Sequence, residues 1–161
     1  IKAGKVKLNL VAGVRENVRQ NFESFLDKVG LNNNEAVRVV HDNIFDRYFS
    51  KFSDILHTTD ILWTKPSELS FYCGLGIPII MAPCIGPHEA ANKMWLQEIG
   101  AGIPQVDAKY CGEWLMDYLV DGRFAQAAWD GFLYARSMGK YKIQEVLATG
   151  SMTREISPVK R

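Results

Sequence analysis

The sequence predicts an α/β fold, a three-layer Rossmann-like domain whose mostly parallel sheet of five to six strands carries helices on both faces. Two observations predict it. Hydrophobic residues switch repeatedly between the period of 2 that is typical of strands and the period of 3.6 that is typical of helices. One apolar run, from Ile77 to Ala82, contains no polar residue, as expected for a parallel strand covered on both faces.

Strands are predicted where apolar residues alternate or run together. Lys5 to Leu10 alternates, with Val6 and Leu8 on one face, and Gly13 then supplies a turn toward a helix. The later strands are short apolar runs bounded by turn-forming residues. They are expected at Ala36–Val40, Asp60–Trp63, Ile77–Ala82 and Gly102–Val106.

Helices are predicted where apolar residues recur three or four positions apart. In the first helix Val18, Phe22 and Val29 share one face, and Gly30 ends it. The helices are expected at Arg15–Val29, Ile44–Leu56, Ser67–Leu75 and His88–Ile99, with two or three more between Lys109 and Ala148. Aromatic residues that fit the helical spacing are assigned to the core, namely Trp95, Trp114, Trp129 and Phe132.

The composition narrows the class of protein. The 161 residues are 47% hydrophobic and carry a formal charge of +1. The basic residues are dispersed along the sequence, so no basic patch for nucleic acid is predicted. Three cysteines without a CxxC pair indicate reduced thiols and a cytoplasmic setting. No apolar run approaches the roughly 20 residues of a transmembrane segment. Residues 1–150 are assigned to one domain and residues 151–161 to an irregular tail.

Polar residues follow the third predicted strand, at the edge where open parallel sheets bind ligands. Ser67 could cap the next helix, whose free N–H groups and positive dipole end suit a phosphate, with Lys65 beside it. Glu68 could accept hydrogen bonds from ribose hydroxyls. The structural alternative is that Ser67 is an ordinary helix cap and Lys65 a solvated charge.

A second polar group, His88, Glu89 and Asn92, follows the fourth predicted strand within one helical turn. Such polar groups at the core-facing head of a helix need partners, and sugar hydroxyls would supply them. Neighbouring loop carbonyls could satisfy them equally well, and the spacing leaves both possibilities open. His41 and His57 lack zinc-like spacing, so no metal site is predicted.

The segment from Thr64 to Gly102 resembles the C-terminal, nucleotide-sugar-binding half of GT-B glycosyltransferases. The most similar group contains the bacterial GlcNAc transferase of peptidoglycan-precursor synthesis and the diacylglycerol glycosyltransferases, in which TKPGG, GLPMI, PGQExxNA and GAG motifs follow in order. The matching segments here are Thr64–Pro66, Gly76–Ile80, Gly86–Asn92 with His88 in place of Gln, and Gly100–Gly102.

The resemblance implies a metal-independent transferase of a hexose or N-acetylhexosamine that uses a nucleotide-sugar donor, UDP-sugar, and no other cofactor. The nucleotide would lie near Gly13 and against the loop of Asn43, Ile44 and Phe45, where backbone groups read the base. The acceptor site and the catalytic base would belong to a missing N-terminal domain. This chain alone, as the C-terminal half of a two-domain protein, is therefore expected to be inactive, and no catalytic residue is assigned to it.

Two alternative functions stay open at this point. A non-catalytic nucleotide-sugar-binding or regulatory module is favoured by the first loop, which keeps only one glycine, Gly13. A half-domain of a sugar-nucleotide epimerase would share the architecture, but it is expected to bring further acidic and histidine residues. The presence of a preceding acceptor domain in the full reading frame would favour the transferase.

Overall fold

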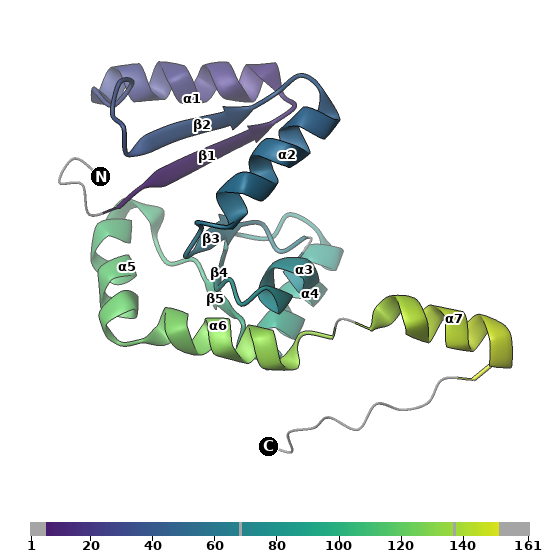
Figure 1. The fold of residues 1–161 in the computed structure, drawn as a ribbon. Helices are drawn as coiled ribbons and strands as arrows, with labels where there is room; N and C mark the ends of the chain where they lie inside the picture. Colours follow the sequence, from purple (N-terminus) through teal and green to yellow (C-terminus); the bar gives the residue numbers. More distant parts are fainter. Residues whose placement is uncertain (1–5, 68, 137, 152–161) are drawn as a thin grey trace. The chain divides into compact units, whose positions relative to one another are not determined.

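A computed structural model describes residues 6–67, 69–136 and 138–151 of the chain. Glu68 and residues 152–161, most of the predicted tail, lie outside this part. The described residues form a mixed α/β structure with parallel strands, which confirms the predicted class (Figure 1). The chain divides into two compact units, with the boundary between Thr59 and Asp60.

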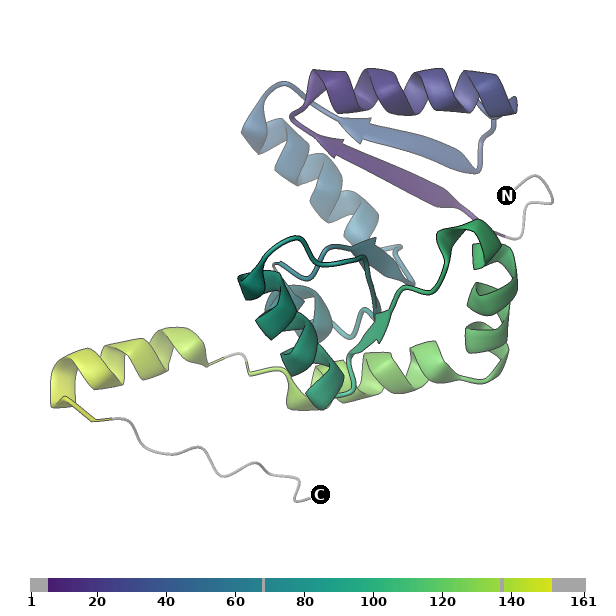
Figure 2. The same cartoon turned by 180° about the vertical axis from the view of Figure 1, so that it is seen from behind.

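The first unit is a strand–helix–strand–helix segment. Its elements are β1 (Leu8–Gly13), α1 (Glu16–Val29), β2 (Val37–His41) and α2 (Phe45–Leu56). The two strands are parallel, with Leu8 opposite Val37 and Gly13 opposite His41, and both helices contact them (Figure 2). Gly30 ends α1 in the left-handed conformation, as the sequence predicts.

The second unit contains a parallel sheet in the order β3-β4-β5. Its elements are β3 (Leu62–Thr64), α3 (Leu69–Gly74), β4 (Ile79–Met81), α4 (Pro87–Glu98), β5 (Gly102–Pro104), a 3-10 turn (Ala108–Tyr110), α5 (Cys111–Val120), α6 (Arg123–Tyr134) and α7 (Gly139–Thr149). Within the described ranges, no helix combines the length and apolar character needed to cross a membrane.

The central strand β4 has a core on each face. Ile79 and Met81 pack on one side with residues of α3 and α4, including Leu96. Ile80 points to the other side and packs with Trp114 of α5 and Phe124 of α6. This alternation confirms that the apolar run at Ile77–Ala82 is a parallel strand covered on both faces.

The described strands form smaller sheets than predicted, because hydrogen bonds join them into one pair and one set of three. Prolines limit the central strand of the second unit. Pro78 and Pro83 flank β4. Because proline has no N–H to donate, it stops the ladders of β4 from extending at either end. Hydrophobic periodicity identifies strands, but it does not say which of them share an edge.

The assignment of all four aromatic residues to the core is wrong for α6. Trp114 is buried, but Trp129 and Phe132 are 61% and 62% exposed. The buried stripe of α6 consists instead of Phe124, Ala127 and Gly131. A Cβ on Gly131 would lie 2.9 Å from a backbone oxygen of α3, so its absence allows the two helices to approach closely.

Candidate functional site

The carboxyl edge of the second sheet carries the residues that follow β3 and β4. Because these strands are parallel, with Thr64 opposite Met81, the loops after them begin at the same edge. The amide of Ala82 also donates to the carbonyl of Thr64, at 2.8 Å, which extends the ladder beyond the strands. The two motif segments that the sequence places after separate strands therefore start side by side.

Asn92 ties α4 to the loop between β3 and α3. Its Nδ2 donates to the carbonyl oxygens of Pro66 and Ser67, at 3.1 and 3.2 Å. Ser67 and Asn92 line a shallow hollow of about 230 Å³ together with Leu69 and Trp95. Two of the predicted site residues are thus brought together, and part of the hydrogen-bonding capacity of Asn92 satisfies loop carbonyls.

Glu89 is buried, with 8% of its surface exposed, in the first turn of α4. Its Oε2 accepts a hydrogen bond from the amide of Ile85, at 2.6 Å. This contact resembles a capping box, in which an acidic residue at the third helical position reaches back to an N–H before the helix. The carboxylate also lies where the helix dipole favours negative charge. Glu89 therefore stabilises the start of α4.

The other predicted residues of this edge are open to solvent. Lys65 and Ser67 are exposed, and Ser67 lies just ahead of α3. His88 is exposed in the first turn of α4, and its imidazole lies against Gly86, where a Cβ would be 3.0 Å from Cε1. The small residue at Gly86 therefore leaves room for the ring of His88.

The first unit holds the remaining predicted nucleotide-binding residues at the carboxyl edge of its own strands. Gly13 ends β1 with φ of 65°, and its carbonyl accepts a hydrogen bond from the amide of Asp42, at 3.3 Å. Asn43, Ile44 and Phe45 follow β2 and are exposed. The amide of Ile44 already donates to Oδ1 of Asp42, at 3.0 Å. That donor is therefore engaged within the loop.

Residues 2–141 match the family described as Domain of unknown function (DUF6938). The chain belongs to this family. No curated protein and no solved structure matches it. The DUF6938 match extends across the boundary at Thr59 and Asp60, so the family region includes the candidate residues of both units.

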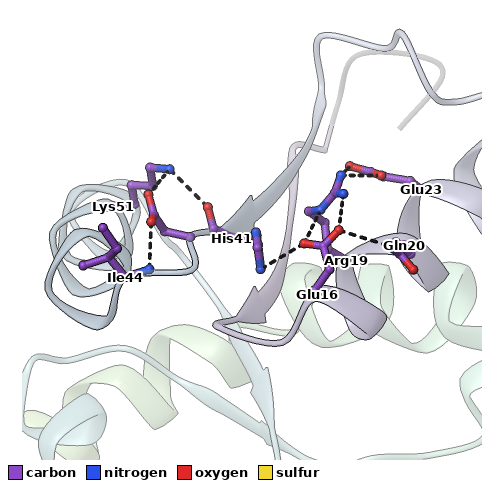
Figure 3. Close-up of polar contacts among 8 residues, drawn as sticks. Glu16, Arg19, Gln20, Glu23, His41, Ile44 and Lys51 are labelled. Carbon is purple, nitrogen blue, oxygen red and sulfur yellow. Dashed lines mark hydrogen bonds and ion pairs between the residues drawn. The ribbon is translucent and has the colours of Figure 1, made fainter.

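The structure of this DUF6938 domain also reveals a polar cluster that the sequence does not predict (Figure 3). Arg19 donates hydrogen bonds to Glu16 and Glu23, and Nε2 of His41 lies 3.5 Å from Oε2 of Glu16. Hydrogen bonding by Arg19 is the main reason that the pKa of Glu16 falls from 4.5 to about 2. The spacing of Glu16, Arg19 and Glu23 indicates pairs along a helix, but His41 joins them only through the fold.

A second ion pair lies beside this cluster. Nζ of Lys51 donates to Oδ2 of Asp42 at 2.8 Å and to the carbonyl of His41 at 3.1 Å. The hydrogen bond from Lys51, followed by that from the amide of Ile44, lowers the pKa of the Asp42 carboxyl. In the part of the DUF6938 domain that the structure describes, no three His, Cys, Asp or Glu side chains group as metal ligands.

Proposed function

We propose that this chain is the donor-binding domain of a GT-B glycosyltransferase that transfers a hexose or N-acetylhexosamine from a UDP-sugar. One observation supports the proposal above others. Asn92 belongs to one segment that resembles a motif of the transferases, Ser67 directly follows another, and the two residues line one hollow at the carboxyl edge of a parallel sheet. A cytoplasmic setting and a Rossmann-like arrangement remain part of this proposal.

The polar groups suggest a division of roles at this edge. Lys65 and the hydroxyl of Ser67 are exposed and would bind the diphosphate, which becomes the leaving group. Asn92 uses its Nδ2 on the loop carbonyls, so its Oδ1 would accept from a sugar hydroxyl. Glu89 would act in the same way through the oxygen that does not bind Ile85, with His88 beside it.

The first unit enters the proposal through the resemblance alone, which assigns its loop at Asn43, Ile44 and Phe45 to the base and Gly13 to close approach of a phosphate to the backbone. The amide of Ile44 is engaged by Asp42, so the amides of its neighbours would read the base edge. No metal is required in this scheme, and the acceptor and the catalytic base would come from an N-terminal domain outside this sequence.

Calorimetry with UDP, GDP, ADP and UDP-sugars tests the donor-binding function. The chain alone is expected to bind UDP weakly and to show no turnover, because in this proposal the other wall of the cleft would belong to an acceptor domain. Ser67→Ala should weaken UDP binding by about 1 kcal/mol, whereas the control Ser50→Ala, an exposed residue of α2, should not change it. If no nucleotide gives heat at millimolar concentration, donor binding is refuted.

A non-catalytic nucleotide-sugar-binding module is the second candidate. It is favoured by the hydrogen bonds that Glu89 and Asn92 make within the chain, which give both residues a structural role. The full-length protein distinguishes the two functions. Transfer of the sugar to an acceptor supports the transferase, while tight donor binding with no transfer or hydrolysis supports the module.

A further inference from the structure

Among the described residues of the first unit, one buried side-chain polar atom makes no hydrogen bond. The side chain of His41 is 10% exposed, and its Nε2 makes no hydrogen bond within the described residues. This nitrogen lies 3.5 Å from Oε2 of Glu16, beyond the usual length of an N–H···O hydrogen bond. A buried nitrogen with no partner is uncommon in folded proteins, so its position needs an explanation.

The backbone at this end of β2 is held from the side of α2. Lys51 donates to the carbonyl of His41 and to the carboxylate of Asp42, and Asp42 accepts from the amide of Ile44. Figure 3 shows the imidazole of His41 pointing the other way, toward Glu16 at the start of α1. His41 therefore stands between the β2–α2 loop and α1.

The charged groups around His41 come from three elements. They are Glu16, Arg19 and Glu23 of α1, Lys51 and Arg47 of α2, and Asp42 beside His41. β1 contributes none, because Leu8–Gly13 contains no charged residue. Arg19 is paired with two carboxylates and Lys51 with another. The carboxylate that faces the imidazole is that of Glu16, 3.5 Å from Nε2.

Glu16 keeps its negative charge over the whole physiological range. Hydrogen bonding by Arg19, and then by Gln20, holds its pKa at about 2. Histidine is the side chain that ordinarily changes charge between about pH 5 and 8. Whether the Glu16–His41 contact is an ion pair is therefore decided by the proton on His41.

We propose that His41 is a positioning residue: in its protonated form it donates Nε2–H to Glu16 and thereby holds the loop of Asp42 to Phe45 against α1. Closing the gap from 3.5 Å to the roughly 2.8 Å of a charge-assisted bond requires only a small side-chain rotation. The link between this loop and a nucleotide base rests on the proposed function. The contact between His41 and Glu16 does not.

Thermal denaturation of the full chain tests the contact, with Glu16→Gln compared with the control Glu23→Gln. Both changes remove a carboxylate that binds Arg19, but only Glu16 faces His41. The melting temperature of Glu16→Gln relative to the control should be about 2–4 °C lower at about pH 5.5 than at about pH 8. The place of Glu16 in the first turn of α1 and its hydrogen bond from Gln20 contribute equally at both pH values. An equal difference at both pH values overturns the proposal.

His41→Gln supplies the second comparison, because glutamine keeps an N–H donor but cannot titrate. In this background the melting difference between Glu16→Gln and Glu23→Gln should no longer depend on pH. If it still grows on acidification, another group is responsible and the proposal fails. His57 and His88 are present in every variant, so they are common to both sides of the comparison.

UDP binding tests the effect on the loop. Lowering the pH from about 8 to 5.5 should raise the UDP affinity of the wild type about threefold more than that of His41→Gln. The reason is that a loop that is already ordered loses less conformational entropy when UDP binds. Identical pH dependence in the two proteins would overturn the positioning role. If UDP binds to neither, the proposed function fails, while the melting comparison still decides whether His41 pairs with Glu16.

Discussion

Asn92 provides the sharpest test of the candidate site. Its Nδ2 donates to two carbonyl oxygens of the β3–α3 loop, and one of these hydrogen bonds is exposed. At about 0.5–1.5 kcal/mol for each bond, with the exposed one near the low end, Asn92→Ala should lose about 1–2 kcal/mol. For a chain of 161 residues this is a fall in melting temperature of about 3–6 °C.

Asn92→Asp should be worse than alanine. The carboxylate has nearly the shape of the amide, but it offers only acceptors, and it would face the two carbonyl oxygens that Nδ2 now binds. The loss should exceed that of Asn92→Ala by about 1 kcal/mol. The helix dipole gives little compensation, because Asn92 lies beyond the first turn of α4.

Circular dichroism melting at neutral pH measures this order, with Asn32→Asp as a control for the added charge in an exposed turn. If Asn92→Asp melts with or above Asn92→Ala, the two hydrogen bonds do not hold α4 to the β3–α3 loop. Ligand binding then separates structure from recognition. Loss of a residue that only ties α4 to this loop should weaken the binding of UDP and UDP-sugar alike, whereas loss of a sugar contact should weaken UDP-sugar binding by a further 1–3 kcal/mol or so.

The remaining predictions concern the cores and the acid limit. Ile80→Ala, at a fully buried position in β4, should cost about 2–5 kcal/mol in urea unfolding, while Ile85→Ala, 79% exposed, should stay within about 0.5 kcal/mol of the wild type. Gly131→Ala should destabilise, because its Cβ would crowd a carbonyl of α3, whereas Gly112→Ala, with open space around it, should stabilise by roughly 0.5–1 kcal/mol. Folding lowers the pKa of Glu16, so its ionised carboxylate contributes fully to the stability of the fold above about pH 4.5. This contribution is lost as the pH falls toward 2. In Glu16→Gln this part of the acid dependence should be absent from acid denaturation.

Local features of the fold were predictable because they depend on residues close in sequence. Helical spacing followed by Gly30 predicts α1 and its end, and the run at Ile77–Ala82 predicts a strand buried on both faces. The side that α6 buries was not predictable in this way. The face of α6 with Ala127 and Gly131 is buried, and the face with Trp129 is exposed, because α3 packs closely against the small residues. This contact is a property of the packed helices and not of the spacing within α6.

Some polar contacts were predictable from the sequence and others were not. The sequence places Ser67 and Asn92 after neighbouring strands, so their meeting at one edge could be expected. That Asn92 donates to the β3–α3 loop depends on the position of individual carbonyl oxygens, which spacing does not determine. The approach of His41 to Glu16 depends on the parallel register of β1 and β2, and the sequence gives only an isolated histidine.

These structural contacts also restrict the ligand that the edge could bind. The Nδ2 of Asn92 donates to loop carbonyls, so only its Oδ1, an acceptor, remains for a ligand. Glu89 is a carboxylate, so its second oxygen is also an acceptor. An acceptor pairs with a hydroxyl but repels a phosphate oxygen, so the diphosphate would have to lie nearer Lys65 and the hydroxyl of Ser67. The bonds of Asn92 to the β3–α3 loop and of Glu89 to Ile85 are therefore compatible with the proposed sugar contacts, since they fix which atom of each side chain a hydroxyl would meet.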